Sequence, residues 1–226
     1  MSLLTPHLEI LPERQQRLWP SLAGLAGVGF VLYGGTAIAL RYGHRVSVDF
    51  DFFSDRPLDR QRLSKALPWM NAALVLQDQP ETLTLLTSGD KVQTGVKVSF
   101  FGGLTIGRVA DPDYTLDQVA LVASPPDLLA TKLKVLLQRA ERKDYLDVAT
   151  LLNSGLALSD GLAAAQALYG AGFPVRECLK ALVYFADGDL AELGNSEKRQ
   201  LEQAVMAVDW IPSLKRIGRE LGPSQP

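Results

Sequence analysis

The sequence predicts an α+β fold in which a small mixed β-sheet, flanked by helices, is followed by a helical C-terminal half. Up to about residue 122, short runs rich in Val, Leu, Phe and Thr alternate with segments of helical periodicity. After Pro125-Pro126 only helical patterns remain. We therefore expect an α/β domain at residues 1–123 and a helical domain at residues 124–226 that packs against the cleft of the first.

The elements can be assigned in chain order. A helical pattern opens the chain, and Gly43 is expected to end the short helix that begins at Thr36. Gly89-Asp90 suits a hairpin turn between the last two strands. The expected strands are residues 29–33, 47–53, 73–78, 82–87 and 92–101. The expected helices are residues 11–26, 36–41, a helix from about residue 58, and residues 126–140, 143–153, 159–169, 174–186 and 196–218.

Residues 30–36 combine a strand, a glycine turn and the start of a helix. Phe30–Tyr33 is a short apolar run, Gly34-Gly35 follows as the turn, and Thr36 begins the helical pattern. Glycines let a backbone approach a phosphate closely, and a helix start offers it unpaired N–H groups. A Gly-Gly pair alone is typical of an ordinary turn, so its interpretation depends on the residues that follow.

Two carboxylates follow inside an apolar run. Because side chains alternate along a strand, Asp49 and Asp51 share one face with Ser47, and lie about 6.5 Å apart. The opposite face is apolar and consists of Val48, Phe50 and Phe52. An Asp-x-Asp pair alone is typical of a solvated strand, but after a glycine turn it favours a site for a hard cation and a polyphosphate.

At these residues the chain resembles the nucleotidyltransferase superfamily and, more closely, the AbiEii/AbiGii toxin family. The resemblance implies that Asp49 and Asp51 are catalytic and bind Mg²⁺. The nucleotide-binding residues that it implies are Gly34, Gly35, Thr36, Arg45 and Ser47. It also implies a nucleoside triphosphate substrate, a tRNA end or a protein as acceptor, and a cognate antitoxin.

A second block resembles later motifs of the same family. It comprises residues 126–133 and 139–147, which carry Lys132 and Asp144 as further catalytic residues. Lys132 lies at the border of the apolar stripe of its helix. Its ammonium either binds a triphosphate oxygen or simply reaches the solvent, as an ordinary surface lysine does. Asp144 and Asp147 share a helix face, so a nearby cation such as Lys132 is expected; a solvated helix start is the alternative.

One position departs from the superfamily. Many members carry a third carboxylate on a later strand, where this chain has Ser99. A serine is a poor magnesium ligand and a poor base. Either another acid such as Asp144 takes the role, or acceptor activation is weak, or catalysis has been lost.

Composition limits the classes of function. The chain has 226 residues, 47% of them hydrophobic and 21% charged, so it can bury a substantial core. A net charge of -2 argues against broad electrostatic binding to nucleic acid or membrane. The lone Cys178 excludes an intramolecular disulfide and suits a core position. Without a signal-type start or an apolar run of membrane-spanning length, we expect no membrane partner and a cytoplasmic bacterial protein.

Three functions remain. The first is a magnesium-dependent nucleotidyltransferase that moves a nucleoside monophosphate onto a hydroxyl, as the toxin of a toxin–antitoxin or phage-defence pair. The second is a nucleotide-binding or interaction module of the same fold that has lost turnover. The third is a small-molecule nucleotidyltransferase of the aminoglycoside-modifying type, whose acidic cleft Asp111, Asp113 and Asp117 would supply.

Overall fold

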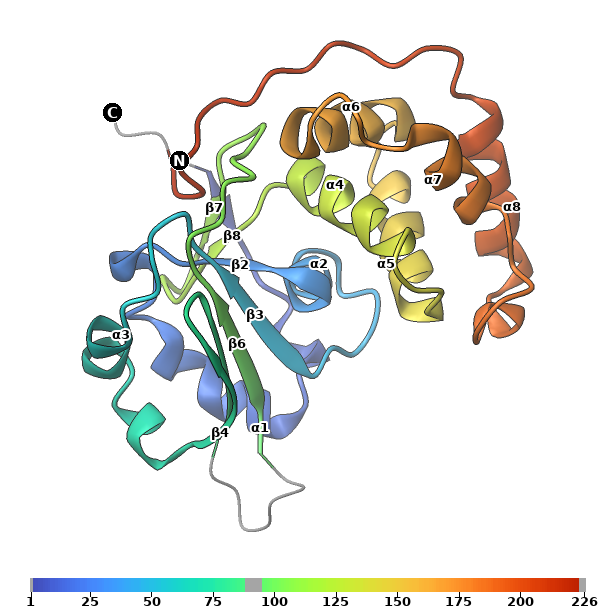
Figure 1. The fold of residues 1–226 in the computed structure, drawn as a ribbon. Helices are drawn as coiled ribbons and strands as arrows, with labels where there is room; N and C mark the ends of the chain where they lie inside the picture. Colours follow the sequence, from blue (N-terminus) through green and yellow to red (C-terminus); the bar gives the residue numbers. More distant parts are fainter. Residues whose placement is uncertain (1, 88–94, 224–226) are drawn as a thin grey trace. The chain divides into compact units, whose positions relative to one another are not determined.

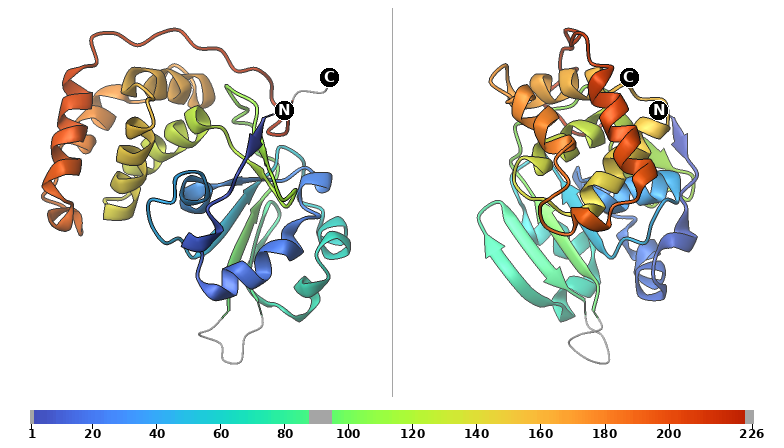
Figure 2. Two further views of the ribbon diagram at one scale, coloured as in Figure 1. Left: turned by 180° about the vertical axis from the view of Figure 1, so that it is seen from behind. Right: turned by 90° about the vertical axis from the view of Figure 1, so that its right-hand side faces the viewer.

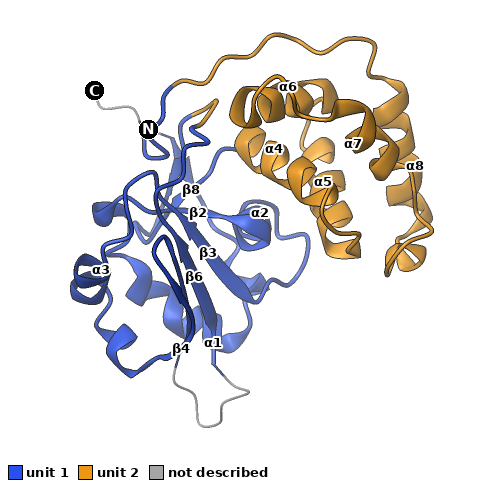
Figure 3. Ribbon diagram, in the orientation of Figure 1, with its two compact units in different colours: residues 1–107, 111–124, 218–226 blue, residues 108–110, 125–217 orange. Residues whose placement is uncertain are grey.

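The computed structural model describes residues 2–87 and 95–223, which form two compact units (Figures 1 and 3). Unit 1 comprises residues 1–107, 111–124 and 218–226, and unit 2 comprises residues 108–110 and 125–217. The strands are β1 (Leu3–Leu4), β2 (Val31–Tyr33), β3 (Asp49–Phe53), β4 (Leu74–Gln79), β5 (Thr82–Leu86), β6 (Lys97–Phe101), β7 (Asp113–Thr115) and β8 (Leu121–Val122). The helices are α1 (Glu13–Leu18), α2 (Gly34–Tyr42), α3 (Arg60–Ala66), α4 (Pro125–Leu136), α5 (Arg142–Asn153), α6 (Leu158–Tyr169), α7 (Val175–Leu182) and α8 (Asn195–Met206).

Unit 1 is built on a mixed sheet, as the sequence predicts. Its eight strands lie in the order β1-β7-β8-β2-β3-β6-β5-β4. The central strand β3 is antiparallel to β2 and parallel to β6. Phe50 and Phe52 are fully buried on one face of β3, and Trp19 from the N-terminal segment lies with its ring centroid 5.9 Å from that of Phe50. The helical turns near the N-terminus therefore cover this face of the sheet (Figure 2).

A buried arginine fixes α2 to the short strands. Arg41, in the last turn of α2, donates hydrogen bonds to the carbonyl oxygens of Val122 and Ala123. Its guanidinium also pairs with Asp113 of β7 at 2.6 Å, and its side chain is 7% exposed. Because these groups would otherwise be buried without partners, they define where α2 lies on the sheet.

Unit 2 is helical, and α4 is its central element. α4 packs against α5, α6 and α7. A Cβ atom at Gly161 of α6 would lie 2.4 Å from Cδ2 of Leu129, so glycine is required for this close approach of α6 to α4. Asp127 in the first turn of α4 accepts a hydrogen bond from the N–H of Val109 at 2.8 Å, which ties residues 108–110 to this unit.

The structure corrects several expected boundaries. The predicted helix at 11–26 is only α1 followed by 3-10 turns, because Pro20 and the glycines that follow it interrupt the α-helix. The predicted helix at 196–218 ends at Met206. Val48 precedes β3 and is 52% exposed, so it does not pack with Phe50. The predicted Gly89-Asp90 turn lies outside the described residues.

Candidate active site

β3 and β6 arrange one polar face of the sheet. Asp49 and Asp51 alternate with the buried Phe50 and Phe52, as predicted, and both are partly exposed. In the parallel register Asp49 lies beside Lys97, and Asp51 lies beside Ser99. The position where the superfamily carries a third carboxylate is therefore filled by a serine next to Asp51, and this serine is buried.

Gly34 brings the start of α2 against Asp51. Tyr33 pairs with Asp51 across the antiparallel β2–β3 ladder, so the next residue lies near that carboxylate. Gly34 has φ +73°, and a Cβ atom there would lie 2.8 Å from Oδ2 of Asp51. The N-cap residue of α2, Tyr33, makes no hydrogen bond from its own side chain to the first turn of the helix. The glycine turn thus places Asp51 beside a helix start that carries a partial positive charge.

The hydroxyl of Thr36 holds this arrangement together. Thr36 and Ser47 are both buried, and their hydroxyl oxygens are 2.8 Å apart. The Thr36 hydroxyl also contacts the carbonyl oxygen of Asp49. These contacts fasten the first turn of α2 to the chain that leads into β3. Arg45, in the connection between them, donates a hydrogen bond to the carbonyl oxygen of Val46 at 3.0 Å.

Lys97 is a site residue that the sequence analysis missed. Its Nζ lies 2.8 Å from Oδ2 of Asp49, and both side chains are about two-fifths exposed. The signal was available, because Lys97 stands two residues before Ser99 on the same strand and so shares its face.

Lys132 lies in a buried charge cluster between α4 and α5. Its Nζ is 2.7 Å from Oδ1 of Asp144 and 2.6 Å from Oδ2 of Asp147. Arg139 completes the cluster, with its Nε 2.8 Å from Oδ2 of Asp144. Both carboxylate side chains are fully buried. The expectation that a cation lies beside the two aspartates is confirmed.

Two cations control the ionisation of Asp144. Burial by itself raises the pKa of this carboxyl. The hydrogen bond from Arg139, together with the charge of Lys132, outweighs burial and holds the pKa of Asp144 below its ordinary value.

The predicted residues therefore gather in two groups. Unit 1 brings together Gly34, Gly35, Thr36, Arg45, Ser47, Asp49 and Asp51 around the start of α2 and the start of β3. Unit 2 brings together Lys132 and Asp144 with Asp147.

Residues 22–224 match the family model described as "Nucleotidyl transferase AbiEii toxin, Type IV TA system". The chain belongs to this family. The predicted resemblance is thereby confirmed, together with the class of protein, a nucleotidyltransferase toxin family.

One sequence relative and two solved structures are similar to this AbiEii chain. An uncharacterised protein from Aquifex aeolicus (strain VF5) is 31% identical over 162 residues, which cover 70% of this chain and 74% of the relative. The fold is similar to that of a putative nucleotidyltransferase from H. pylori, with a TM-score of 0.55 and 16% identity over 85% of this chain and 92% of the other. It is also similar to MenT4, a nucleotidyltransferase toxin from Mycobacterium tuberculosis H37Rv, with a TM-score of 0.57 and 11% identity over 85% and 82% of the chains.

Other candidate groups in this AbiEii chain have structural partners. Asp113 pairs with Arg41, and Asp117 accepts a hydrogen bond from the indole N–H of Trp19 at 2.7 Å. Two of the three acids considered for an acidic cleft thus stabilise unit 1. Cys178 is fully buried, and burial raises the pKa of its thiol to about 12, so it is a core residue as predicted.

Within residues 2–87 and 95–223, no group of three or more His, Cys, Asp or Glu side chains is arranged to hold a metal ion. In the same ranges no single helix is long and apolar enough to cross a membrane. Only α5 and α6 taken together, with a bend of 115° between them, have that length and apolar composition.

Proposed function

We propose that this chain is a magnesium-dependent nucleotidyltransferase that transfers a nucleoside monophosphate from a nucleoside triphosphate to a hydroxyl and releases pyrophosphate. The observation that carries the proposal is the approach of Asp51 to the start of α2, which only a glycine at position 34 permits. A carboxylate beside a helix start places a metal-binding group next to a phosphate-binding group.

The residues present fit a magnesium ion. Mg²⁺ in phosphoryl-transfer sites is held by one or two carboxylates, with substrate phosphates and water as its other ligands. Asp49 and Asp51 supply such a pair on one strand face, and the missing Cβ of Gly34 leaves room at Oδ2 of Asp51. When bound, the ion supplies charge neutralisation for the phosphates and the attacking oxygen. Asp49 and Asp51 hold and orient it.

The phosphates bind at the glycine turn. The hydroxyls of Thr36 and Ser47 already hydrogen bond within the chain, so in this proposal they position the turn. The N–H groups at Gly35 and Thr36 then meet the phosphate oxygens. Arg45, in the connection between α2 and β3 of the same unit, adds positive charge beside the turn.

Asp144 is better suited to orienting a neighbouring side chain than to accepting a proton. A carboxylate held ionised by Lys132 and Arg139 is a weak base, since its pKa is lowered. We therefore assign it the task of orienting Lys132. Because Ser99 cannot act as a base beside Asp51, the acceptor hydroxyl, on a tRNA end or a protein, loses its proton with little help from this chain.

The family description also bears on the partner. It names a type IV toxin–antitoxin system, and we propose that this chain is the toxin and has a cognate antitoxin. Because nucleoside triphosphates are cytoplasmic, we place its action in the cytoplasm.

Transfer of label from each α-labelled nucleoside triphosphate in Mg²⁺ tests the proposal, with total tRNA or cell protein as acceptor. We expect Asp49→Asn and Asp51→Asn to lower transfer by on the order of a hundredfold or more. Asp78→Asn, which removes an exposed carboxylate from the edge strand β4, serves as the matched control. Equal transfer by the native protein, the two active-site variants and the control variant contradicts the proposal.

Ser99 favours one alternative, a nucleotide-binding module of the same fold without turnover. That alternative predicts triphosphate binding that depends on Asp49 and Asp51, with no transfer to any acceptor. The same four proteins therefore separate the two functions.

A further inference from the structure

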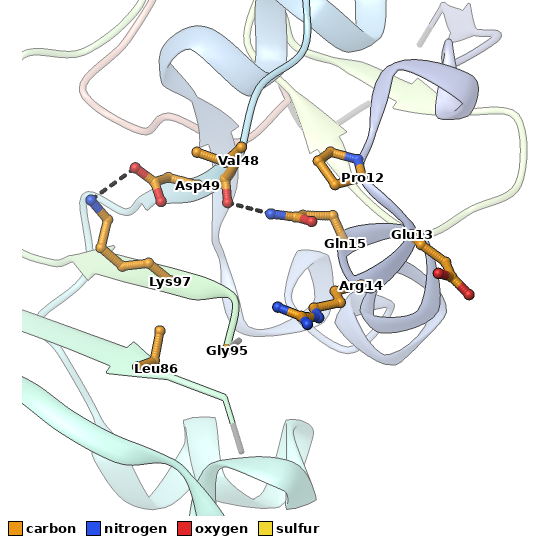
Figure 4. Close-up of a pocket in the computed structure, with 9 residues that line it drawn as sticks. All are labelled: Pro12, Glu13, Arg14, Gln15, Val48, Asp49, Leu86, Gly95 and Lys97. Carbon is orange, nitrogen blue, oxygen red and sulfur yellow. Dashed lines mark hydrogen bonds and ion pairs between the residues drawn. The ribbon is translucent and has the colours of Figure 1, made fainter. Parts of the chain in front are cut away.

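A pocket of about 470 Å³ opens beside Asp49 in unit 1 (Figure 4). It lies where β3 and β6 begin, and residues of α1 form its other wall. The lining residues are Pro12, Glu13, Arg14, Gln15, Val48, Asp49, Leu86, Gly95 and Lys97. Gln15 is buried and is held in place by its amide, which donates a hydrogen bond to the carbonyl oxygen of Val48 at 2.6 Å. The wall on the α1 side is therefore fixed to the entrance of β3.

One cation of the pocket forms no ion pair with a described residue. Glu13 pairs with Arg17, outside the pocket, and its carboxylate points away from the hollow in Figure 4. Asp49 pairs with Lys97 at 2.8 Å. Arg14 has no ion pair among residues 2–87 and 95–223, and Figure 4 shows its guanidinium extending toward Gly95 across the hollow. When Arg17, which neutralises Glu13 from outside the pocket, is included, the charges sum to one positive charge, and Arg14 carries it.

The pocket's size and lining suit a phosphate ester. Its volume falls within the roughly 300–1,000 Å³ of pockets that hold small ligands. Pro12, Leu86 and Val48 provide apolar wall, and a guanidinium binds phosphate oxygens with two parallel hydrogen bonds. Asp49 belongs both to this pocket and to the metal-binding pair proposed above. A phosphate-bearing group bound here lies next to the reacting atoms.

We propose that this pocket is a phosphate subsite, in which Arg14 is the counter-charge for a phosphate group of one of the two reactants. The identity of the two reactants rests on the proposed function. The binding of a phosphate group rests on the residues of the pocket itself. The phosphate belongs either to the triphosphate or to the backbone of a nucleic-acid acceptor.

Binding measurements distinguish the two sources without any need for turnover. Fluorescence anisotropy gives the Kd of the native protein and its variants for a labelled, non-hydrolysable nucleoside triphosphate in Mg²⁺, and for a labelled single-stranded oligoribonucleotide. Arg14→Gln removes the charge, and Arg14→Lys keeps it. Arg62→Gln is the matched control, because it removes an exposed arginine from α3 of the same unit, outside the pocket.

We expect Arg14→Gln to raise the Kd of one probe about three- to tenfold, with Arg14→Lys recovering much of the loss. Arg62→Gln should stay within about twofold of the native protein. If the affected probe is the oligoribonucleotide, the slope of the logarithm of the association constant against the logarithm of the salt concentration should also become less negative by about 0.7.

Three results overturn the proposal: no effect of Arg14→Gln on either probe, equal effects of Arg14→Gln and Arg62→Gln, or no binding of either probe by the native protein. The catalytic proposal fails separately. Arg14-dependent binding without any nucleotide transfer supports the subsite and contradicts the transferase. Transfer with a KM that Arg14→Gln leaves unchanged does the reverse.

Discussion

In the proposed metal site, Lys97 is expected to compete with the magnesium ion for Asp49. Its ammonium occupies one side of the Asp49 carboxylate at 2.8 Å, so a metal ion must share or displace it. We predict that Lys97→Met tightens the binding of Mn²⁺, used as a spectroscopic substitute for Mg²⁺. Because the ion pair is partly exposed, the expected change in Kd is only about two- to fivefold.

Electron paramagnetic resonance of free Mn²⁺, measured without nucleotide, gives this affinity. Lys65→Met is the matched control, since it removes an exposed lysine from α3 of the same unit. Weaker binding by Lys97→Met, or a similar gain in Lys65→Met, shows that the ammonium does not compete at Asp49.

Gly34 should be intolerant of any side chain. Gly34→Ala combines a left-handed backbone, at φ +73°, with a Cβ atom 2.8 Å from Oδ2 of Asp51. Gly155→Ala shares the left-handed backbone, at φ +99°, but its Cβ atom would meet nothing within 4 Å. Backbone strain alone costs about 1–2 kcal/mol. We predict a larger loss of unfolding free energy for Gly34→Ala, together with weaker Mn²⁺ binding that Gly155→Ala does not show.

Denaturant unfolding and Mn²⁺ titration of the two alanine variants check this prediction. Native-like Mn²⁺ affinity in Gly34→Ala means that the turn does not position Asp51.

The sequence predicts the strand face of some side chains in the site, but not the partners of others. The alternation in β3 places Asp49 and Asp51 on one face, because a strand allows no other arrangement. The partner of Asp49 depends on the register of β6, and the charge of Arg14 becomes informative only when the pairing of Glu13 and Lys97 is known. Register and pairing are tertiary facts that periodicity does not contain.

The charge cluster joins α4 to α5. Lys132 contacts Asp144 and Asp147, which are fully buried, so Lys132→Met leaves two carboxylates without their shared cation. Removing one partner of a buried ion pair costs about 3–5 kcal/mol, because the remaining charge stays desolvated. We predict a loss of this size in the unfolding free energy, measured by denaturant titration with circular dichroism.

Lys143→Met is the control for this change. Lys143 pairs with Glu141 at 2.8 Å on the surface, and its loss should cost less than about 1 kcal/mol. Equal losses for the two variants contradict a structural role for the buried cluster.

The same cluster makes stability depend on pH. The pKa of Asp144 is lower in the folded protein than in the unfolded chain, so its contribution is complete above the unfolded value, about 4. As pH falls through and below that value, the unfolded chain binds the proton first and stability declines. We predict that Asp144→Asn lowers stability at pH 7 and flattens this decline below about pH 4. Denaturant midpoints between pH 3 and pH 7 test it, and an equally steep decline in the variant assigns the effect to other acids.

Long elements were predictable and short ones were not. The patterns of α4, α5 and α6 persist over several turns, and the predicted starts agree with the structure to within one residue. β1 and β8 contain only two residues each, too few for an alternation to show. They are strands because β7 and β2 pair with them. The end of α8 was wrong by 12 residues, although Pro212 in the following segment argues against a continuous helix.

The chain as a whole is interleaved between its two units. The predicted domains meet at residues 123 and 124, and the two units exchange the chain at Ser124 and Pro125. Sequence reasoning did not foresee that residues 108–110 belong to unit 2 or that residues 218–226 belong to unit 1. Neither segment has a periodic pattern. Each is assigned by tertiary contacts, such as the hydrogen bond from the N–H of Leu221 to Oδ1 of Asp55 at 3.0 Å.

This interleaving predicts that a residue near the C-terminus stabilises the N-terminal unit. Leu221 is 1% exposed, whereas Leu214, in the segment before it, is 41% exposed. Leu221→Ala should therefore destabilise unit 1 by about 2–5 kcal/mol, while Leu214→Ala should cost little. In a Trp210→Phe background the remaining tryptophans, Trp19 and Trp69, both lie in unit 1, so their fluorescence follows its unfolding. If Leu221→Ala leaves that transition unchanged, the last residues are dispensable, and a chain ending before residue 218 should retain a stable unit 1.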